Sequence, residues 1–367
     1  MSSGGNDLPA IALLGPAIEH RESLHATLAA HAAALHWIPD SFTHLRQHRY
    51  SGPVPWSRRF DSIRGTRHAG YLAMLEQALS STRVELVVAY WGTLPIGDIL
   101  ALKRMRPDIK VVLLALCYPL ALSTPGLLRQ RITLAHAAPH IDGVVCPGPE
   151  MMAYLSLHGF SAKRTPMESV RPCWPRSHFA NAQTTSISPR PNLVYVGRTD
   201  LSGASVHVAD DLRALILELL DSGVQVSHGQ SKETDDGHAL RNPFKPIPVP
   251  ELTTLMSAHD ASLVAYNLDA CRRTERFDLT VPDRLITSVA AGVPIAIPKH
   301  GYAASKTYLR DYPAVLEFES AQDLRRQLAD RDAVARRRER AWQSRLQYTA
   351  ENQGPTMTKL LQAVLQR

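Results

Sequence analysis

The stretch VPDRLITSVAAGVP, residues 281–294, decides the fold of this chain. Pro282 supplies a rigid first turn and Asp283 a side chain that can cap a helix, so the pattern predicts a helix that begins here. Gly292 is suited to leave that helix through positive φ, and the apolar residues 295–297 predict a strand after it. A helix N-terminus after a strand and a loop favours a bound phosphate. By itself, however, the stretch is more typical of an ordinary α/β unit.

A resemblance adds to this interpretation. The order Pro282, Asp283, Arg284, Leu285, followed by AAGVP at residues 290–294, resembles the nucleotide-sugar helix of GT-B glycosyltransferases, especially the large retaining family 4. In that family a glutamate holds the ribose hydroxyls of the nucleotide, and Thr287 stands at its position here, so the chain resembles a divergent member. The resemblance implies an α/β fold of two Rossmann-like, doubly wound domains that face a cleft.

Composition sets the broad class of the protein. The chain has 367 residues, 44% of them hydrophobic and 20% charged, which is enough for two globular domains. No apolar run is long enough to cross a bilayer and the first residues show no signal pattern, so we expect a cytoplasmic protein and leave peripheral membrane contact open. The four cysteines show no C-x-x-C spacing, which favours buried thiols. The net charge of +7 predicts a surface that attracts anions.

The first half alternates strand and helix patterns. Apolar runs predict strands at residues 11–16, 84–90, 110–116 and 143–146, with a weaker candidate at 35–38, and helices at 24–35, 71–79, 96–105, 127–138 and 150–157. This alternation is typical of a doubly wound parallel sheet. No G-x-G-x-x-G follows the first strand and no P-loop occurs, so the sequence does not favour a dinucleotide-binding dehydrogenase or a P-loop NTPase.

Domain boundaries follow from composition. Periodicity disappears and prolines gather between residues 162 and 191, which predicts a linker that is partly an ordered connection. We therefore predict an N-terminal acceptor-side domain at residues 1–165, a linker at 166–190 and a nucleotide-sugar-binding domain at 191–345. Residues 346–367 should form a helix that returns to the first domain. The arginines at 336–338 and 340 are expected on a polar helix face, with Trp342 and Leu346 inward.

The second half carries the donor candidates. Strands are predicted at residues 192–199, 224–226 and 261–266, and helices at 210–220 and 250–259. The family uses a Tyr-x-Gly-Arg strand end, here residues 195–198, to approach the diphosphate with backbone and a guanidinium. A lysine that usually follows is absent. The resemblance and the strand ends give the donor-binding candidates Gly197, Arg198, Thr199, Tyr266, Asn267, Pro282, Asp283, Arg284, Leu285, Thr287 and Ser288.

A basic excursion points to the acceptor. Residues 44–68 contain six arginines with Tyr50, Trp56 and Phe60 between them. Arginines bind phosphates and aromatic rings stack on bases or sugars, so an anionic acceptor is the hypothesis, although a solvated basic loop explains the pattern about equally well. The acceptor-binding candidates are Gly15, Arg58, Arg59, Trp56, Trp91 and Tyr118.

The resemblance implies a glycosyltransferase that moves a sugar from a nucleotide sugar to an anionic acceptor, such as a lipid-linked or phosphorylated glycan. Its catalytic candidates are Arg198 and Arg284, which would stabilise the leaving diphosphate, with no metal or other cofactor. Inversion would instead need a general base, for which Glu19 and His20 are the nearest candidates. The sequence leaves two alternatives open: a glycosyltransferase acting on modified DNA, and a catalytically silent GT-B protein that binds nucleic acid or a partner.

Overall fold

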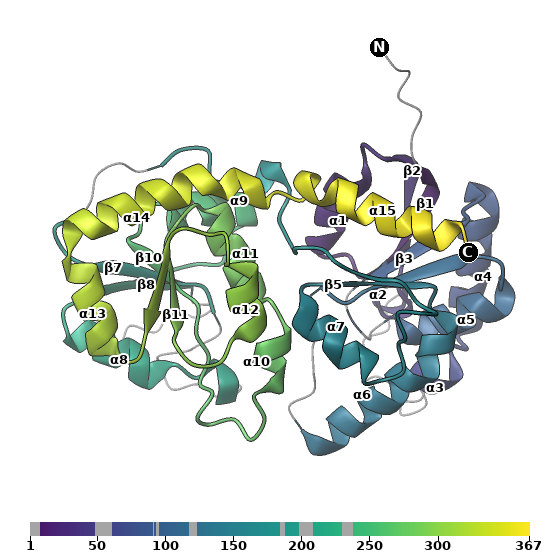
Figure 1. Cartoon of the computed structure of the whole chain (residues 1–367), viewed down its shortest axis with the longest axis horizontal. Helices are drawn as coiled ribbons and strands as arrows, with labels where there is room; N and C mark the ends of the chain where they lie inside the picture. Colours follow the sequence, from purple (N-terminus) through teal and green to yellow (C-terminus); the bar gives the residue numbers. More distant parts are fainter. Residues whose placement is uncertain are drawn as a thin grey trace, which may run out of the picture. The chain divides into compact units, whose positions relative to one another are not determined.

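The computed structural model describes the chain in two compact units: unit 1, Met1–Pro175 with Ala350–Arg367, and unit 2, Arg176–Thr349 (Figure 1). The described residues are 8–47, 61–90, 92, 95–116, 123–183, 188–197, 208–229 and 238–367. Each unit is an α/β layer structure built on one parallel sheet, as the alternation predicts.

The described part of unit 1 forms a six-stranded parallel sheet in the order β2-β1-β3-β4-β5-β6. Its strands are β1 (Leu8–Gly15), β2 (Ala32–Pro39), β3 (Leu86–Tyr90), β4 (Lys110–Leu114), β5 (Gly143–Cys146) and β6 (Met167–Ser169). The helices are α1 (His20–Leu28), α2 (Ser41–Gln47), α3 (Asp61–Arg64), α4 (Ala69–Thr82), α5 (Ile96–Met105), α6 (Thr124–Ala137), α7 (Pro149–Ser156) and α15 (Gly354–Leu365).

The last helix, α15, packs into the core of unit 1. Leu360, Leu361 and Val364 are buried in one cluster with residues of β1, β3 and β4. A Cβ on Gly143 of β5 would lie 2.6 Å from Val364 Cγ2, so glycine lets this helix come close to the sheet. Residues separated by more than 200 positions therefore share one core.

Two predictions for unit 1 are wrong. The helix expected at residues 24–35 ends at Leu28, because the alanine-rich segment after it forms β2 and pairs with β1 from Leu8↔Ala32 to Gly15↔Pro39. Sheet pairing here overrides the helical propensity of alanine. The segment expected as a linker contains β6, which pairs with β5 at Val144↔Met167. All three β6 residues are only partly buried, so the sequence has no alternation of apolar and polar residues that would predict the strand.

Unit 2 repeats the architecture with a parallel sheet of six described strands in the order β12-β11-β10-β7-β8-β9. Its strands are β7 (Asn192–Tyr195), β8 (Gln225–Gly229), β9 (Arg241–Phe244), β10 (Ala261–Leu263), β11 (Ile295–Pro298) and β12 (Val315–Phe318). The helices are α8 (Arg213–Asp221), α9 (Val249–Met256), α10 (Glu275–Leu279), α11 (Asp283–Ala290), α12 (Ala303–Tyr308), α13 (Ala321–Ala329) and α14 (Arg331–Ser344).

Three features of unit 2 differ from expectation. The edge strand β9 was not predicted, because its sequence RNPF contains Pro243, which pattern analysis assigns to a loop. Arg338, expected on a polar face, is buried and donates from Nη2 to the Ser257 carbonyl. Leu346, expected to point inward, is 38% exposed. Arg336 and Arg340 of α14 are exposed as expected, so Arg338 is the buried exception on that face.

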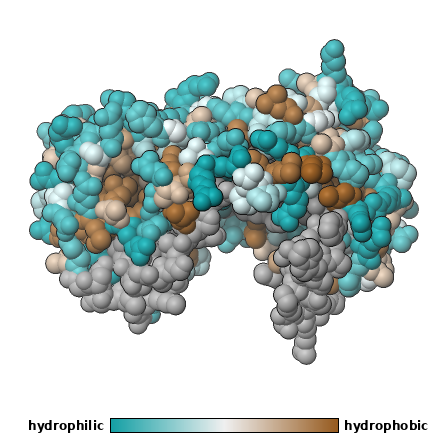
Figure 2. All heavy atoms as spheres, turned by 90° about the horizontal axis from the view of Figure 1, so that it is seen from below, coloured by the Kyte–Doolittle hydropathy of each residue, from teal (hydrophilic) through white to brown (hydrophobic). Residues whose placement is uncertain are grey.

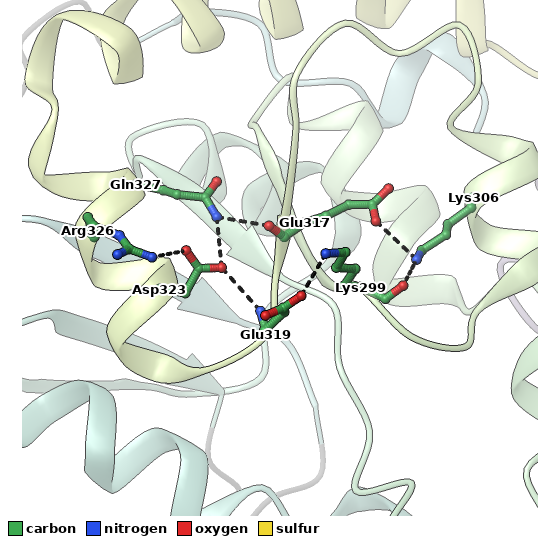
Figure 3. Close-up of polar contacts among 7 residues, drawn as sticks. All are labelled: Lys299, Lys306, Glu317, Glu319, Asp323, Arg326 and Gln327. Atoms are coloured by element: carbon green, nitrogen blue, oxygen red, sulfur yellow. Dashed lines mark hydrogen bonds and ion pairs between the residues drawn. The ribbon is translucent and has the colours of Figure 1, made fainter.

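The other edge strand, β12, is lined by charged side chains (Figure 3). Lys299 Nζ lies 2.6 Å from Glu319 Oε1, and Lys306 Nζ lies 3.2 Å from Glu317 Oε2. Asp323 of α13 accepts from the Glu319 backbone N–H. Charges on an edge strand disfavour pairing with another chain, and exposed pairs of this kind add little stability.

No helix in the described part of the chain is long and apolar enough to span a membrane. Figure 2 shows hydrophilic residues over most of the face it presents, with apolar residues between them.

Candidate functional site

The helix predicted to begin at Pro282 lies where the pattern places it. The α11 helix runs from Asp283 to Ala290, and Gly292 leaves it with a φ of +64°. Asp283 was expected as the cap, but Pro282 occupies the N-cap position and Asp283 is the first helical residue. The N-terminus of α11 has no side-chain cap bond, and its N–H groups remain a feature that favours an anion.

Arg284, in the first turn of α11, is the centre of the candidate donor site. Its Nη1 donates to Tyr195 Oη (3.2 Å) and to the carbonyl oxygen of Ala265 (3.0 Å), at the carboxyl ends of β7 and β10. Its Nη2 lies 3.2 Å from Asp210 Oδ1. The guanidinium carbon is 4.3 Å from the centre of the Tyr266 ring. The carboxyl edge of a parallel sheet is where ligands bind in this class of fold.

The guanidinium stays charged although it is nearly buried. The side chains of Arg284 and Asp210 are 10% and 14% exposed. Burial lowers the pKa of Arg284, but Tyr195, Tyr266 and Asp210 outweigh it, so the pKa lies above its ordinary value. Nη1 and Nη2 together use three acceptors within the described residues, and the guanidinium has five N–H donors in all. The guanidinium is therefore fixed by its neighbours, and its positive charge is paired with the Asp210 carboxylate.

Two tyrosines fix the position of this charge. The Tyr195 ring occupies the space where a Cβ on Gly197 would lie, so glycine at 197 is required for the ring to reach Arg284. The Tyr266 N–H donates to Tyr302 Oη (2.7 Å), and Tyr302 Oη donates to the Tyr266 carbonyl (3.2 Å). Tyr302 has a φ of +63°, an unusual conformation for a bulky residue that its contacts must offset.

The other described donor candidates do not bring a free polar group to this point. Thr287 Oγ1 donates to the Asp283 carbonyl, and Ser288 Oγ donates to the Arg284 carbonyl and shares a hydrogen bond with Ser262 Oγ. Leu285 is fully buried. Asn267 Nδ2 donates to the Asp211 carbonyl, which ties the loop after β10 to the start of α8. These residues support α11 and the loop around it.

Several candidates lie outside the described residues. They are the donor residues Arg198 and Thr199 and the acceptor residues Trp56, Arg58, Arg59, Trp91 and Tyr118. Their roles remain predictions.

Unit 1 contains a cavity at the carboxyl ends of its strands, which we call the unit 1 cavity. The candidate base His20, at the first position of α1, lines it, and its ring is tilted by 38° against the Trp174 ring, with the ring centres 4.9 Å apart. Glu19, at the N-cap of α1, is not among the lining residues. A Cβ on Gly15 would lie 2.7 Å from the ring of Tyr90, which forms part of the wall. The cavity is lined by His20, Ser23, Leu24, Thr27, Tyr90, Leu114, Leu116, Val170, Arg171, Pro172, Cys173 and Met357.

Two carboxylates were not predicted from the sequence as candidate site residues. Asp210 lies 74 positions from Arg284 and is the last residue of a short 3₁₀ turn, so no local pattern links them. Asp98, in the first turn of α5, is 1% exposed and accepts from the Ser41 N–H and from Thr66 Oγ1. Burial raises the pKa of Asp98 to about 6. The only local sign of Asp98 is its place near a helix start.

No group of three or more histidine, cysteine or acidic residues suited to a metal ion occurs in the parts of the chain that the structure describes. Cys146 and Cys173 are buried free thiols, and Cys271 is a partly exposed one.

Comparison with solved structures identifies the fold class as GT-B. No protein-family model matches the sequence, and no curated protein matches it. Sucrose-phosphate synthase from Thermosynechococcus elongatus superposes with a TM-score of 0.65 and 13% identity over 97% of this chain and 99% of that one. HepE from Anabaena, in complex with UDP-glucose, gives 0.60 and 12% over 96% and 99%. WaaG, a glycosyltransferase involved in lipopolysaccharide biosynthesis, gives 0.54 and 12% over 96% and 99%.

Proposed function

We propose that this chain is a glycosyltransferase that moves a sugar from a nucleotide-sugar donor to an anionic acceptor, with unit 2 binding the donor and unit 1 the acceptor. The observation that carries the proposal is Arg284, a charged guanidinium held at the carboxyl edge of the unit 2 sheet beside the N-terminus of α11. Structures of the same fold, including HepE with UDP-glucose, support a nucleotide-sugar donor.

The chemistry of the proposed reaction is stabilisation of a departing diphosphate. Negative charge develops on the leaving oxygen as the bond to the sugar breaks, and a fixed guanidinium and helix N-terminus stabilise it without reorganisation. Arg284 would supply the guanidinium and α11 the dipole, and Arg198 a second charge. Metal is not required in this scheme. His20 is the candidate base if the reaction inverts the anomeric centre, because it lines the unit 1 cavity.

The acceptor is proposed to be a lipid-linked or phosphorylated glycan. Arg171 in the wall of the unit 1 cavity adds a basic residue to the arginines of the excursion at residues 44–68. The net charge of +7 also favours an anionic partner.

Thermal unfolding with a panel of nucleoside diphosphates and nucleotide sugars tests the proposal. We expect at least one to raise the Tm of the wild type, and Arg284→Lys to weaken that ligand by about tenfold to hundredfold, because lysine loses the fork of donors.

Arg331→Lys is the matched control. Arg331 pairs with buried Asp260 at 2.7 Å, in front of the amino end of β10 and away from the candidate site. The Arg331→Lys substitution should lower the Tm of the ligand-free protein and leave the increase in Tm caused by the ligand unchanged. If no nucleotide raises the Tm, or if both variants lose the shift equally, the proposal is wrong.

A further inference from the structure

The unit 1 cavity has a shape and a chemistry that select a particular ligand group. Its wall combines α1, the ends of β3 and β4, the segment after β6 and Met357 of α15. The volume of the cavity that is open to the centres of water molecules is about 30 Å³. About 10–15 Å³ is needed for one water molecule, so the cavity has room for about two waters or one group of acetyl size.

Most of the wall cannot form new hydrogen bonds. Leu24, Leu114, Leu116, Val170, Pro172 and Met357 present apolar side chains. The Thr27 hydroxyl donates to the Ser23 carbonyl at 2.8 Å. The Tyr90 hydroxyl donates to the Pro16 carbonyl at 2.5 Å and accepts from Trp37 Nε1 at 3.1 Å. The donor hydrogens of Thr27 and Tyr90 are therefore already engaged. His20, Arg171 and Cys173 also line the cavity, and each already interacts with another residue.

One buried hydroxyl in the wall, that of Ser23, lacks a hydrogen-bond partner in the described part of the chain. Ser23 is 9% exposed, and its Oγ has no hydrogen-bond partner among the described residues. A buried hydroxyl without a partner is unfavourable, so a ligand acceptor that reaches it is favoured.

We propose that the unit 1 cavity binds an acetyl group, most simply the acetamido group of an N-acetylated sugar in the acceptor. The methyl group would contact the apolar wall, and the carbonyl oxygen would accept the hydrogen bond of Ser23. This inference rests on the proposed function, because it names a property of the acceptor that unit 1 would bind.

Binding of small sugars tests the inference without any transfer reaction. Titration calorimetry or ligand-observed NMR with the full chain would compare N-acetylglucosamine with glucosamine, glucose and N-propionylglucosamine. We expect the acetylated sugar to bind at least about tenfold more tightly than the first two, because it buries a methyl group and satisfies Ser23. The propionyl sugar should gain no affinity over the acetyl one, because only about 30 Å³ of the cavity is open to the centres of water-sized groups.

Variants locate the binding. Ser23→Ala should weaken the acetylated sugar by about fivefold to tenfold and leave glucose unchanged, because one hydrogen bond is lost. The matched control is Ser81→Ala, an exposed serine at the end of α4 in the same unit. Equal binding of the acetylated sugar, glucosamine and glucose overturns the inference, as does an acetyl preference that survives Ser23→Ala. Nucleotide binding by unit 2 would persist in either case, so failure here is distinct from failure of the proposed function.

Discussion

Asp210 lies where it would compete with a donor for Arg284, and Asp210→Asn tests this directly. Loss of one partner of a buried ion pair costs about 3–5 kcal/mol. Asparagine keeps an oxygen that can accept from Arg284 Nη2, and Tyr195 Oη and the Ala265 carbonyl remain as acceptors. We therefore expect the free energy of unfolding to fall by only about 1–3 kcal/mol.

The same change should strengthen binding of a diphosphate. At an effective dielectric constant of about 20, two like charges about 7 Å apart repel by about 2 kcal/mol, and salt reduces this value. Removal of the Asp210 charge should thus raise the affinity for a nucleoside diphosphate by about tenfold, with a smaller gain at high salt. Few substitutions both destabilise a protein and tighten its ligand, so the combination is diagnostic.

Two measurements are needed: urea unfolding followed by circular dichroism, and titration calorimetry with the nucleoside diphosphate that stabilises the wild type. Asp260→Asn is the matched control, because it removes the partner of Arg331 elsewhere in unit 2. It should destabilise the protein and leave the affinity unchanged. Unchanged or weaker diphosphate binding by a folded Asp210→Asn protein would refute the assignment of Arg284 to the donor.

Three further predictions follow from the buried groups and the charged edge. Burial raises the pKa of Asp98 from 3.8 to about 6, so the folded state binds this proton more tightly than the unfolded state does. This group therefore lowers the free energy of unfolding by about 2 kcal/mol as the pH rises from 4 to 7. Asp98→Asn should gain stability relative to the wild type over that interval in urea titrations, and a difference that is constant with pH would contradict the raised pKa. Gly197→Ala should displace the Tyr195 ring, lower stability by about 1–3 kcal/mol and weaken donor binding, whereas Gly229→Ala, whose Cβ would make only ordinary contacts, should bind the donor normally; equal donor binding by the two variants would remove the role given to Tyr195. Glu319→Gln should leave the Tm and its salt dependence unchanged, because its pair with Lys299 is exposed; a clear drop in Tm would show that the network in Figure 3 is cooperative.

Local signals in the sequence were sufficient for the regular elements. Pro282 and Gly292 mark the two ends of α11, and the predicted helix at residues 96–105 and strand at 143–146 agree with α5 and β5. The α/β class with two parallel sheets is confirmed. Proline and glycine mark the ends of such elements, and continuous apolar runs mark buried strands. Each element can therefore be predicted from its own segment of sequence.

The candidate site was harder to predict from the sequence, because it depends on contacts between residues that are far apart in the chain. The pairing of Arg284 with Asp210, and the place of Tyr195 over Gly197, follow from sheet order and not from spacing along the chain. The unit 1 cavity needs Val170 from beyond an unpredicted strand and Met357 from the last helix. The resemblance to family 4 does not extend to Thr287. Its hydroxyl donates to the Asp283 carbonyl of its own helix, and threonine has no carboxylate that could bind a ribose.

The central claim is that unit 2 uses Arg284 and α11 to stabilise the diphosphate of a nucleotide sugar. The most direct test is the release of nucleoside diphosphate from a panel of nucleotide sugars by the wild type, Arg284→Lys and Arg331→Lys. We expect the wild type and Arg331→Lys to hydrolyse the same donor and Arg284→Lys to do so about a hundredfold more slowly. No hydrolysis of any donor by the wild type, or equal rates for the two variants, would contradict it.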